Sequence, residues 1–207
     1  MKRTIAMILA LAFMFGLCVA AYAQDKEEKK LVEIDSNTIT VRDDGTGLSD
    51  SKEGMEKTVV LTNRNIGYKG QSGPFVFEVE GIQIAKLVVT DEDTAFFLDL
   101  EPGKEVTLVS IQMSVENTSN ENLTFFPYTS TIVTSDKEQV MGDWLLSDEV
   151  GGEFKGNVVK QGQIYWFCNN TNADNLTHLR WIIEAPHDRR SNEVGEEVVI
   201  EFNLPKG

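Results

Sequence analysis

The sequence predicts an all-β domain with the architecture of an antiparallel β-sandwich, and three observations predict it. Apolar and polar residues alternate with a period of two in many stretches after residue 23, the pattern of a strand with one buried face. Turn segments rich in Gly, Asn and Asp separate these stretches. Helical periodicity is nearly absent, and short strands without intervening helices favour antiparallel pairing over a parallel βαβ sheet.

The start of the chain has the three parts of a cleavable signal peptide. Lys2 and Arg3 form a basic beginning, a long apolar run follows, and Ala21-Tyr22-Ala23 places small residues just before Gln24. We therefore expect residues 1–23 to be removed during export.

The same segment could instead anchor the chain. An apolar run of about 18 residues can just span a bilayer, but the abrupt change to a charged leader at residues 24–30 favours cleavage. Cys18 could carry a lipid, but bulky Leu17 precedes it where lipidation signals need a small residue. We expect a secreted or otherwise extracytoplasmic protein (extracellular, periplasmic or in the cell envelope) that has no transmembrane anchor after cleavage.

The chain is strongly acidic, with a formal net charge of −14. We expect no nucleic-acid partner, because phosphate binding needs clustered Lys and Arg that this chain lacks. The expected partner is an unknown protein or envelope component, and the charge leaves cations, cationic proteins and neutral glycans open.

Cys168 is the one cysteine that remains after cleavage, so no intrachain disulfide can form. It follows Tyr165-Trp166-Phe167, and no basic residue adjoins it to activate the thiol. We expect a small, buried, unreactive side chain.

After the leader, we expect one domain with an N-terminal extension. Residues 31–73 contain two short predicted strands, Thr38–Val41 and Val59–Leu61, and the long acidic loop 42–56. Residues 74–205 form the main part of the domain.

The main part begins with a strand whose phase changes. Phe75, Phe77 and Val79 alternate with polar or smaller residues, and after Gly81 the apolar positions shift to Ile82 and Ile84. This shift predicts a turn or bulge at the glycine. The clearest predicted strand follows at 109–116. Four further strands are predicted at 123–133, 163–168, 179–183 and 198–204.

Three short motifs carry a family resemblance: Val115–Ser119, Ile132–Gln139 and Val159–Phe167. Each is an apolar strand next to turn residues, and their order resembles the bacterial extracellular telokin-like, immunoglobulin-like domains of unknown function found in secreted proteins and lipoproteins. Gln161 departs from the family's usual proline. The resemblance implies an immunoglobulin-like antiparallel β-sandwich over residues 74–205, with no catalytic residues to carry over.

No catalytic constellation stands out. His178 and His187 are the two histidines of the chain, which excludes a three-histidine zinc site. His178 lies on a predicted strand, opposite in phase to Leu179 and Trp181, and His187 lies in a polar loop, so neither is expected to act as a base. The segment Gly70–Pro74 approaches a nucleophile elbow, but Pro74 replaces its last glycine. We expect the protein not to be an enzyme and to need no cofactor.

Calcium is the metal that the sequence permits. Asp43, Asp44 and Asp50 lie in or beside a glycine-containing loop, and hard cations bind several carboxylate oxygens on such loops. Asp91-Glu92-Asp93 is a second acidic cluster. The alternative for both clusters is a solvated turn, where Asp and Gly are common for backbone reasons.

Aromatic residues provide the candidate binding surface: Trp166, Tyr165 and Trp144. In a strand, Trp166 points away from Tyr165 and Phe167, so one side of this triplet faces away from the core and could hold a protein or a sugar ring. The leading functional hypothesis is a non-catalytic binding or accessory domain of the cell envelope. The alternatives are a calcium-dependent adhesion or glycan-binding module and a carbohydrate-active enzyme that uses a carboxylate pair.

Overall fold

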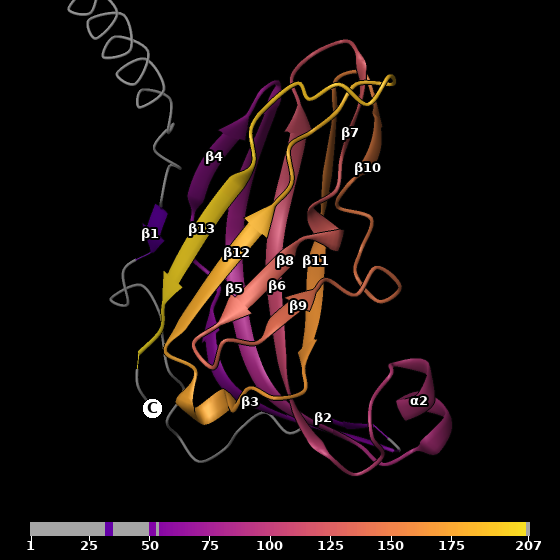
Figure 1. Cartoon of the computed structure of the whole chain (residues 1–207), viewed down its shortest axis with the longest axis vertical. Coiled ribbons are helices and arrows are strands. Elements are labelled where there is room, and N and C mark those ends of the chain that lie inside the picture. The colour runs from indigo at the N-terminus through magenta and orange to yellow at the C-terminus, as the bar shows by residue number, and fades with distance from the viewer. Residues whose placement is uncertain (1–31, 35–49, 53, 206–207) are drawn as a thin grey trace, which may run out of the picture. The chain divides into compact units, whose positions relative to one another are not determined.

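The structure, a computed structural model, describes residues 32–34, 50–52 and 54–205 and confirms the predicted all-β sandwich. Two main sheets lie face to face, and Figure 1 shows β13, β12 and β8 crossing in front of β5 and β6 as a second layer. Strand pairing is antiparallel, except that β1 runs parallel to β13. None of the helices within the described residues has the length and hydropathy needed to cross a membrane.

The larger sheet has the order β11-β6-β5-β3-β2, and β4 also pairs with β5. Its strands are β2 (Asp50–Lys52), β3 (Met55–Asn63), β4 (Tyr68–Ser72), β5 (Phe75–Val89), β6 (Glu105–Asn117) and β11 (Val158–Cys168). The predicted strand at 109–116 is therefore the central part of β6, which pairs along its length with β5 and β11.

The second sheet has the order β1-β13-β12-β8-β9, and β10 and β7 form a separate ribbon. The strands are β1 (Val32–Ile34), β7 (Asn122–Phe125), β8 (Thr131–Thr134), β9 (Gln139–Met141), β10 (Gly152–Lys155), β12 (His178–Ile183) and β13 (Val198–Asn203). The segment predicted as one strand at 123–133 is divided between β7 and β8. A 3-10 turn, η2 (Pro127–Thr129), separates them, because Pro127 has no backbone N–H to donate.

The predicted phase change at Gly81 is confirmed as a β-bulge. The pairing of β5 with β6 shifts register between Val79 and Gly81, so Val79 and Ile82 both point into the core. Gly81 is required there, since an added Cβ would lie 2.8 Å from the carbonyl oxygen of Asn63.

The core lies between the two sheets and contains the largest buried side chains. Trp166 of β11 and Trp181 of β12 meet there edge to face. Cys168 is fully buried in the same core, as predicted.

One short helix, α2 (Glu92–Phe97), was not predicted, and Asp91-Glu92-Asp93 is its beginning rather than a free turn. Ala95 and Leu98 pack on the outer face of the larger sheet against Leu87 and Leu108, in a second apolar cluster. This packing explains how six residues without helical periodicity form a helix. Figure 1 shows α2 in the connection between β5 and β6.

Candidate functional site

The candidate site is the outer face of the larger sheet, the face that points away from the main core. Along β6, residues 109, 111, 113 and 115 point inward, so Leu108, Ser110 and Gln112 point outward. Two hollows lie on this face, and we name them the polar depression and the apolar groove.

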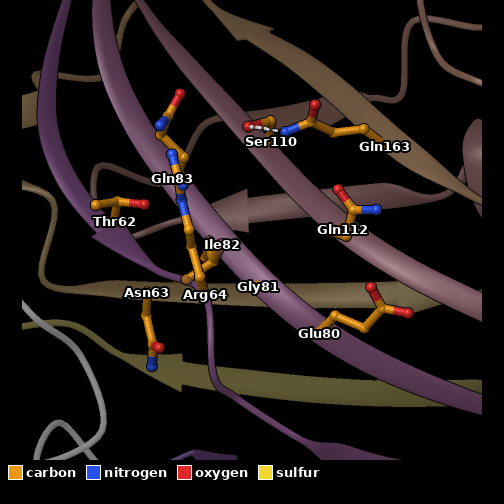
Figure 2. A pocket seen from close by; sticks show the side chains of 10 residues that line it. All are labelled: Thr62, Asn63, Arg64, Glu80, Gly81, Ile82, Gln83, Ser110, Gln112 and Gln163. Atoms are coloured by element: carbon orange, nitrogen blue, oxygen red, sulfur yellow. Dashed lines mark hydrogen bonds between the residues drawn. The ribbon is translucent and has the colours of Figure 1, made fainter. Parts of the chain in front are cut away.

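The polar depression has a volume of about 400 Å³ and is shown in Figure 2. Thr62, Asn63 and Arg64, at the end of β3, form one side. The strands β5, β6 and β11 supply the remaining lining residues: Glu80, Gly81, Ile82, Gln83, Ser110, Gln112 and Gln163.

The bulge in β5 creates this hollow. Gly81 lies opposite Gln112 in the register of the two strands. Because Gly81 has no side chain, the sheet surface beside Gln112 is recessed, while the extra residue of the bulge places Glu80 at the margin. The sequence feature that marks the bulge therefore also forms the floor of the depression.

Hydrogen bonds fix two ends of the depression. At one end, the Tyr165 hydroxyl donates to Gln163 Oε1 over 2.8 Å, and Gln163 Nε2 donates to Ser110 Oγ over 3.1 Å. Burial and the nearby Asp148 carboxylate raise the pKa of the Tyr165 hydroxyl, which keeps it a donor. At the other end, Gln161 Nε2 donates to both carboxylate oxygens of Glu80, over 2.9 and 2.8 Å.

Three lining side chains keep their polar groups available. Within the described part of the chain, Gln83, Gln112 and Arg64 make no side-chain hydrogen bond or ion pair. In Figure 2 the Arg64 side chain extends toward the strand that carries Gln83. Each amide can both donate and accept, and the guanidinium donates only. This set of groups suits a ligand rich in hydroxyl groups.

The apolar groove, about 410 Å³, lies further along the same sheet face toward α2. Its apolar lining comes from the sheet, from α2 and from the loop before β10: Leu87, Leu98, Leu108, Leu146, Tyr165 and Phe167. Met55 and Lys57 of β3 complete it. The two hollows adjoin, because Gln163 borders the first and Tyr165, two residues on, borders the second.

The structure separates the three predicted aromatic residues. The prediction that Trp166 offers a binding surface is wrong: its ring is fully buried, because the inward phase of β11 includes residues 164, 166 and 168. Tyr165 lies on the outward side of the triplet and lines the apolar groove. Trp144 is 69% exposed, and its role in binding stays a prediction.

The calcium candidates fall largely outside the described residues. Asp43 and Asp44 lie there, and for Asp50 only the backbone position in β2 is described. Nowhere in the described chain do three or more His, Cys, Asp or Glu side chains gather so that they could hold a metal ion. The calcium site remains a prediction.

The serine of the elbow-like segment and the two histidines make structural contacts. Ser72 is buried, its hydroxyl donates to the Glu196 carbonyl over 2.6 Å, and it accepts from the Glu196 amide over 2.9 Å. His178 Nε2 lies 3.3 Å from a carboxylate oxygen of Glu201. The backbone of His187 bridges to Thr124 and Glu193.

Sequence reasoning did not find the glutamines of the polar depression. One signal was present: the outward positions of the predicted strand 109–116 hold Ser110 and Gln112, uncharged polar residues, in a strongly acidic chain. Alternation placed them on the outside, but it could not show that Gln83 and Gln163 lie beside them on neighbouring strands.

Fold and site together define an antiparallel β-sandwich protein with two hollows on one outer sheet face. No protein-family model matches the chain. The SPbeta prophage-derived uncharacterized lipoprotein YonS of Bacillus subtilis (strain 168) is 28% identical over 153 residues, which are 73% of this chain and 67% of that protein. A functionally unknown protein from Listeria monocytogenes EGD-e has a similar fold, with a TM-score of 0.56 and 11% identity over 72% of this chain and 88% of that one.

Proposed function

We propose that this protein is an exported, non-catalytic accessory domain of the bacterial cell envelope that binds a glycan in the polar depression. The observation that carries the proposal is the group of unpaired side chains there, Gln83, Gln112 and Arg64. Sugar hydroxyls donate and accept in turn, as amides do, and Arg64 suits an acidic substituent.

We propose a non-catalytic protein because of the residues that line the two hollows. Glu80 is the one carboxylate that lines the polar depression, and the residues described for the apolar groove include none. Glu80 is also engaged by Gln161. A glycosidase uses a pair of carboxyl groups on either side of the scissile bond, and these hollows do not offer that pair.

The envelope location rests on the predicted signal peptide and on the similarity to a protein named as a lipoprotein. We also place the chain with the extracellular telokin-like domains, a proposal that rests on the order of the three strand-and-turn motifs. Fractionation of the source cells and N-terminal sequencing test the location. We expect Gln24 as the first residue of an extracytoplasmic protein, whereas a lipid on Cys18 would contradict cleavage after Ala23.

Glycan binding is tested with peptidoglycan strands from which the peptides have been removed, titrated into the ¹⁵N-labelled protein. We expect shifts of the side-chain amide signals of Gln83 and Gln112. The double variant Gln83→Ala/Gln112→Ala should bind about thirtyfold more weakly, since it loses two hydrogen bonds that contribute about 1 kcal/mol each.

The matched control is Gln139→Ala, which removes an exposed glutamine from β9 in the other sheet. It should leave the affinity for the glycan strands unchanged. Equal weakening by the control and the double variant, or no shift of the two amide signals at millimolar glycan, would refute the proposal.

A further inference from the structure

The apolar groove is bordered by two segments that expose large hydrophobic side chains. Nine such side chains are exposed in the described part of the chain, and five of them lie on these two segments: Phe96, Phe97, Trp144, Leu145 and Leu146. Phe96 is 87% exposed and Trp144 69%. Apolar side chains gathered around a groove mark an interaction surface, whereas scattered ones do not.

Hydrogen bonds hold the loop that carries Trp144 in place. Asp143 Oδ1 accepts from the amides of Leu145 and Leu146, both over 2.9 Å. The Tyr165 amide donates to Ser147 Oγ over 3.0 Å, and the Gln163 amide donates to Asp148 Oδ2 over 2.8 Å. The exposed side chains of this loop are therefore presented by a backbone that is tied to β11.

The same hydrogen bonds restrict how a partner can bind. β11 is the edge strand of the larger sheet, and the loop occupies its edge groups at Gln163 and Tyr165. A peptide cannot add there as a further strand. What remains accessible is the sheet face, which presents side chains, and an amphipathic helix is the element that lays an apolar side into such a groove.

The rims of the groove are acidic. Residues 91–101 contain five carboxylates and residues 143–149 contain three, and neither segment has a Lys or Arg. Among the residues whose side chains are described, the cations nearby are Lys57, which lines the groove, and Lys104, which lies 3.3 Å from Glu101. The apolar floor is therefore bordered on two sides by an excess of negative charge.

We propose that the apolar groove is a docking site for a cationic amphipathic helix of a partner protein. The apolar side of the helix packs on Leu108, Tyr165 and Phe167, and its Lys or Arg residues lie against the carboxylates of the two rims. A second copy of this chain would bring acidic rims against acidic rims, and an anionic bilayer would meet the same repulsion. This site is independent of the glycan proposed for the polar depression.

Trp144 makes the docking directly measurable. The chain has three tryptophans, and Trp166 and Trp181 are fully buried, so acrylamide quenches chiefly Trp144. The probe is an 18-residue peptide of Leu and Lys with helical amphipathic spacing, added to the full chain. We expect a blue shift of the emission and protection of Trp144 from acrylamide. A scrambled peptide of the same composition should give neither.

Two variants separate docking from simple charge attraction. Leu146→Asp and Val159→Asp each replace an exposed apolar residue by a carboxylate, but Leu146 lines the groove, whereas Val159 lies near the far end of β11 and is 63% exposed. We expect at least tenfold weaker peptide binding for Leu146→Asp and no weakening for Val159→Asp, with circular dichroism checking that both remain folded.

Equal affinities of the two variants, or equal protection by the scrambled peptide, would overturn the proposal. Protection of Trp144 by phosphatidylglycerol vesicles, at a level matching the amphipathic peptide, would also overturn it and identify a membrane contact. The peptide should still bind the double variant Gln83→Ala/Gln112→Ala. The docking proposal can therefore be tested even if the glycan proposal fails.

Discussion

The rings of Trp166 and Trp181 meet edge to face in the core, with centroids 5.8 Å apart and planes at 78°. Their indole nitrogens both donate to Ser130: Trp166 to its carbonyl oxygen over 3.0 Å, and Trp181 to its hydroxyl. Ser130, the residue directly before β8, thus connects β11 of the larger sheet with β12 of the second sheet.

Replacement of either indole by phenylalanine should destabilise the protein. Trp166→Phe removes one of two donors to the buried Ser130 carbonyl, which still accepts from the Gly142 amide over 2.8 Å. The loss of this hydrogen bond costs about 0.5–1.5 kcal/mol. Urea unfolding followed by circular dichroism gives the free energy of unfolding for each single variant and for the double variant. We expect a coupling of roughly 0.5–1.5 kcal/mol between the two rings. Additive single effects would contradict the direct contact.

Gly73 should tolerate alanine far less well than Gly103. Both have positive φ, 53° and 77°, but an added Cβ at Gly73 would lie 1.9 Å from the Val194 carbonyl oxygen, whereas nothing lies within 4 Å at Gly103. Gly103→Ala should cost about 1–2 kcal/mol from backbone strain alone, and Gly73→Ala roughly 2–5 kcal/mol. Thermal or urea unfolding gives the free energy of unfolding of both variants. Equal losses of free energy would refute the close approach of Gly73 to the Val194 carbonyl oxygen.

Asp91 should control the stability of α2. Its Oδ1 accepts from the Thr94 hydroxyl over 2.6 Å and from the Thr94 amide over 2.8 Å, and these hydrogen bonds hold the pKa of the Asp91 carboxyl below its ordinary value. We expect about fivefold faster hydrogen exchange at the Ala95 amide in Asp91→Ala, because the helix loses its N-cap.

This cap also has a predictable pH dependence. A depressed pKa in the folded state means that the carboxylate stabilises the helix above the unfolded pKa, near 3.9, and that the stabilisation is lost as the pH falls through the lower folded value. Asp91→Asn keeps a capping side chain without the charge. The protection factor of the Ala95 amide, which is the exchange rate corrected for its intrinsic pH dependence, should therefore not change in that acidic range in Asp91→Asn. If it varied with pH as steeply as in the parent chain, the assignment would be contradicted.

The buried thiol of Cys168 should make the free energy of unfolding decrease as the solution becomes mildly alkaline. Burial, and secondarily the Glu138 carboxylate, raise the pKa of its thiol well above the ordinary range. The unfolded chain therefore loses this proton first as the pH rises past about 8.5, and the free energy of unfolding should drop by about 1.4 kcal/mol per pH unit. The comparison with Cys168→Ala between pH 8 and 9.5 isolates this thiol. Identical slopes would contradict its burial.

The alternation of apolar and polar residues predicted much of the fold because it depends on one physical fact: each strand buries one face in the core and exposes the other. It located the inward set along β6 and the bulge at Gly81 correctly. It failed where burial did not come from the two-sheet core. Ala95 of α2 and Leu98, which caps its end, are buried on the outer sheet face, and no local sequence period predicts burial there.

The sequence by itself determined that this protein is an acidic β-sandwich, because strand periodicity and charge are properties of the chain alone. It could not decide which aromatic residue of Tyr165-Trp166-Phe167 would be accessible, since alternation defines two faces without saying which is covered. The tertiary structure decided that: Trp166 packs between the sheets, and Tyr165 and Phe167 line a groove. It also brought Gln83, Gln112 and Gln163 together from three strands, because strand register is set by long-range pairing that no local sequence pattern encodes.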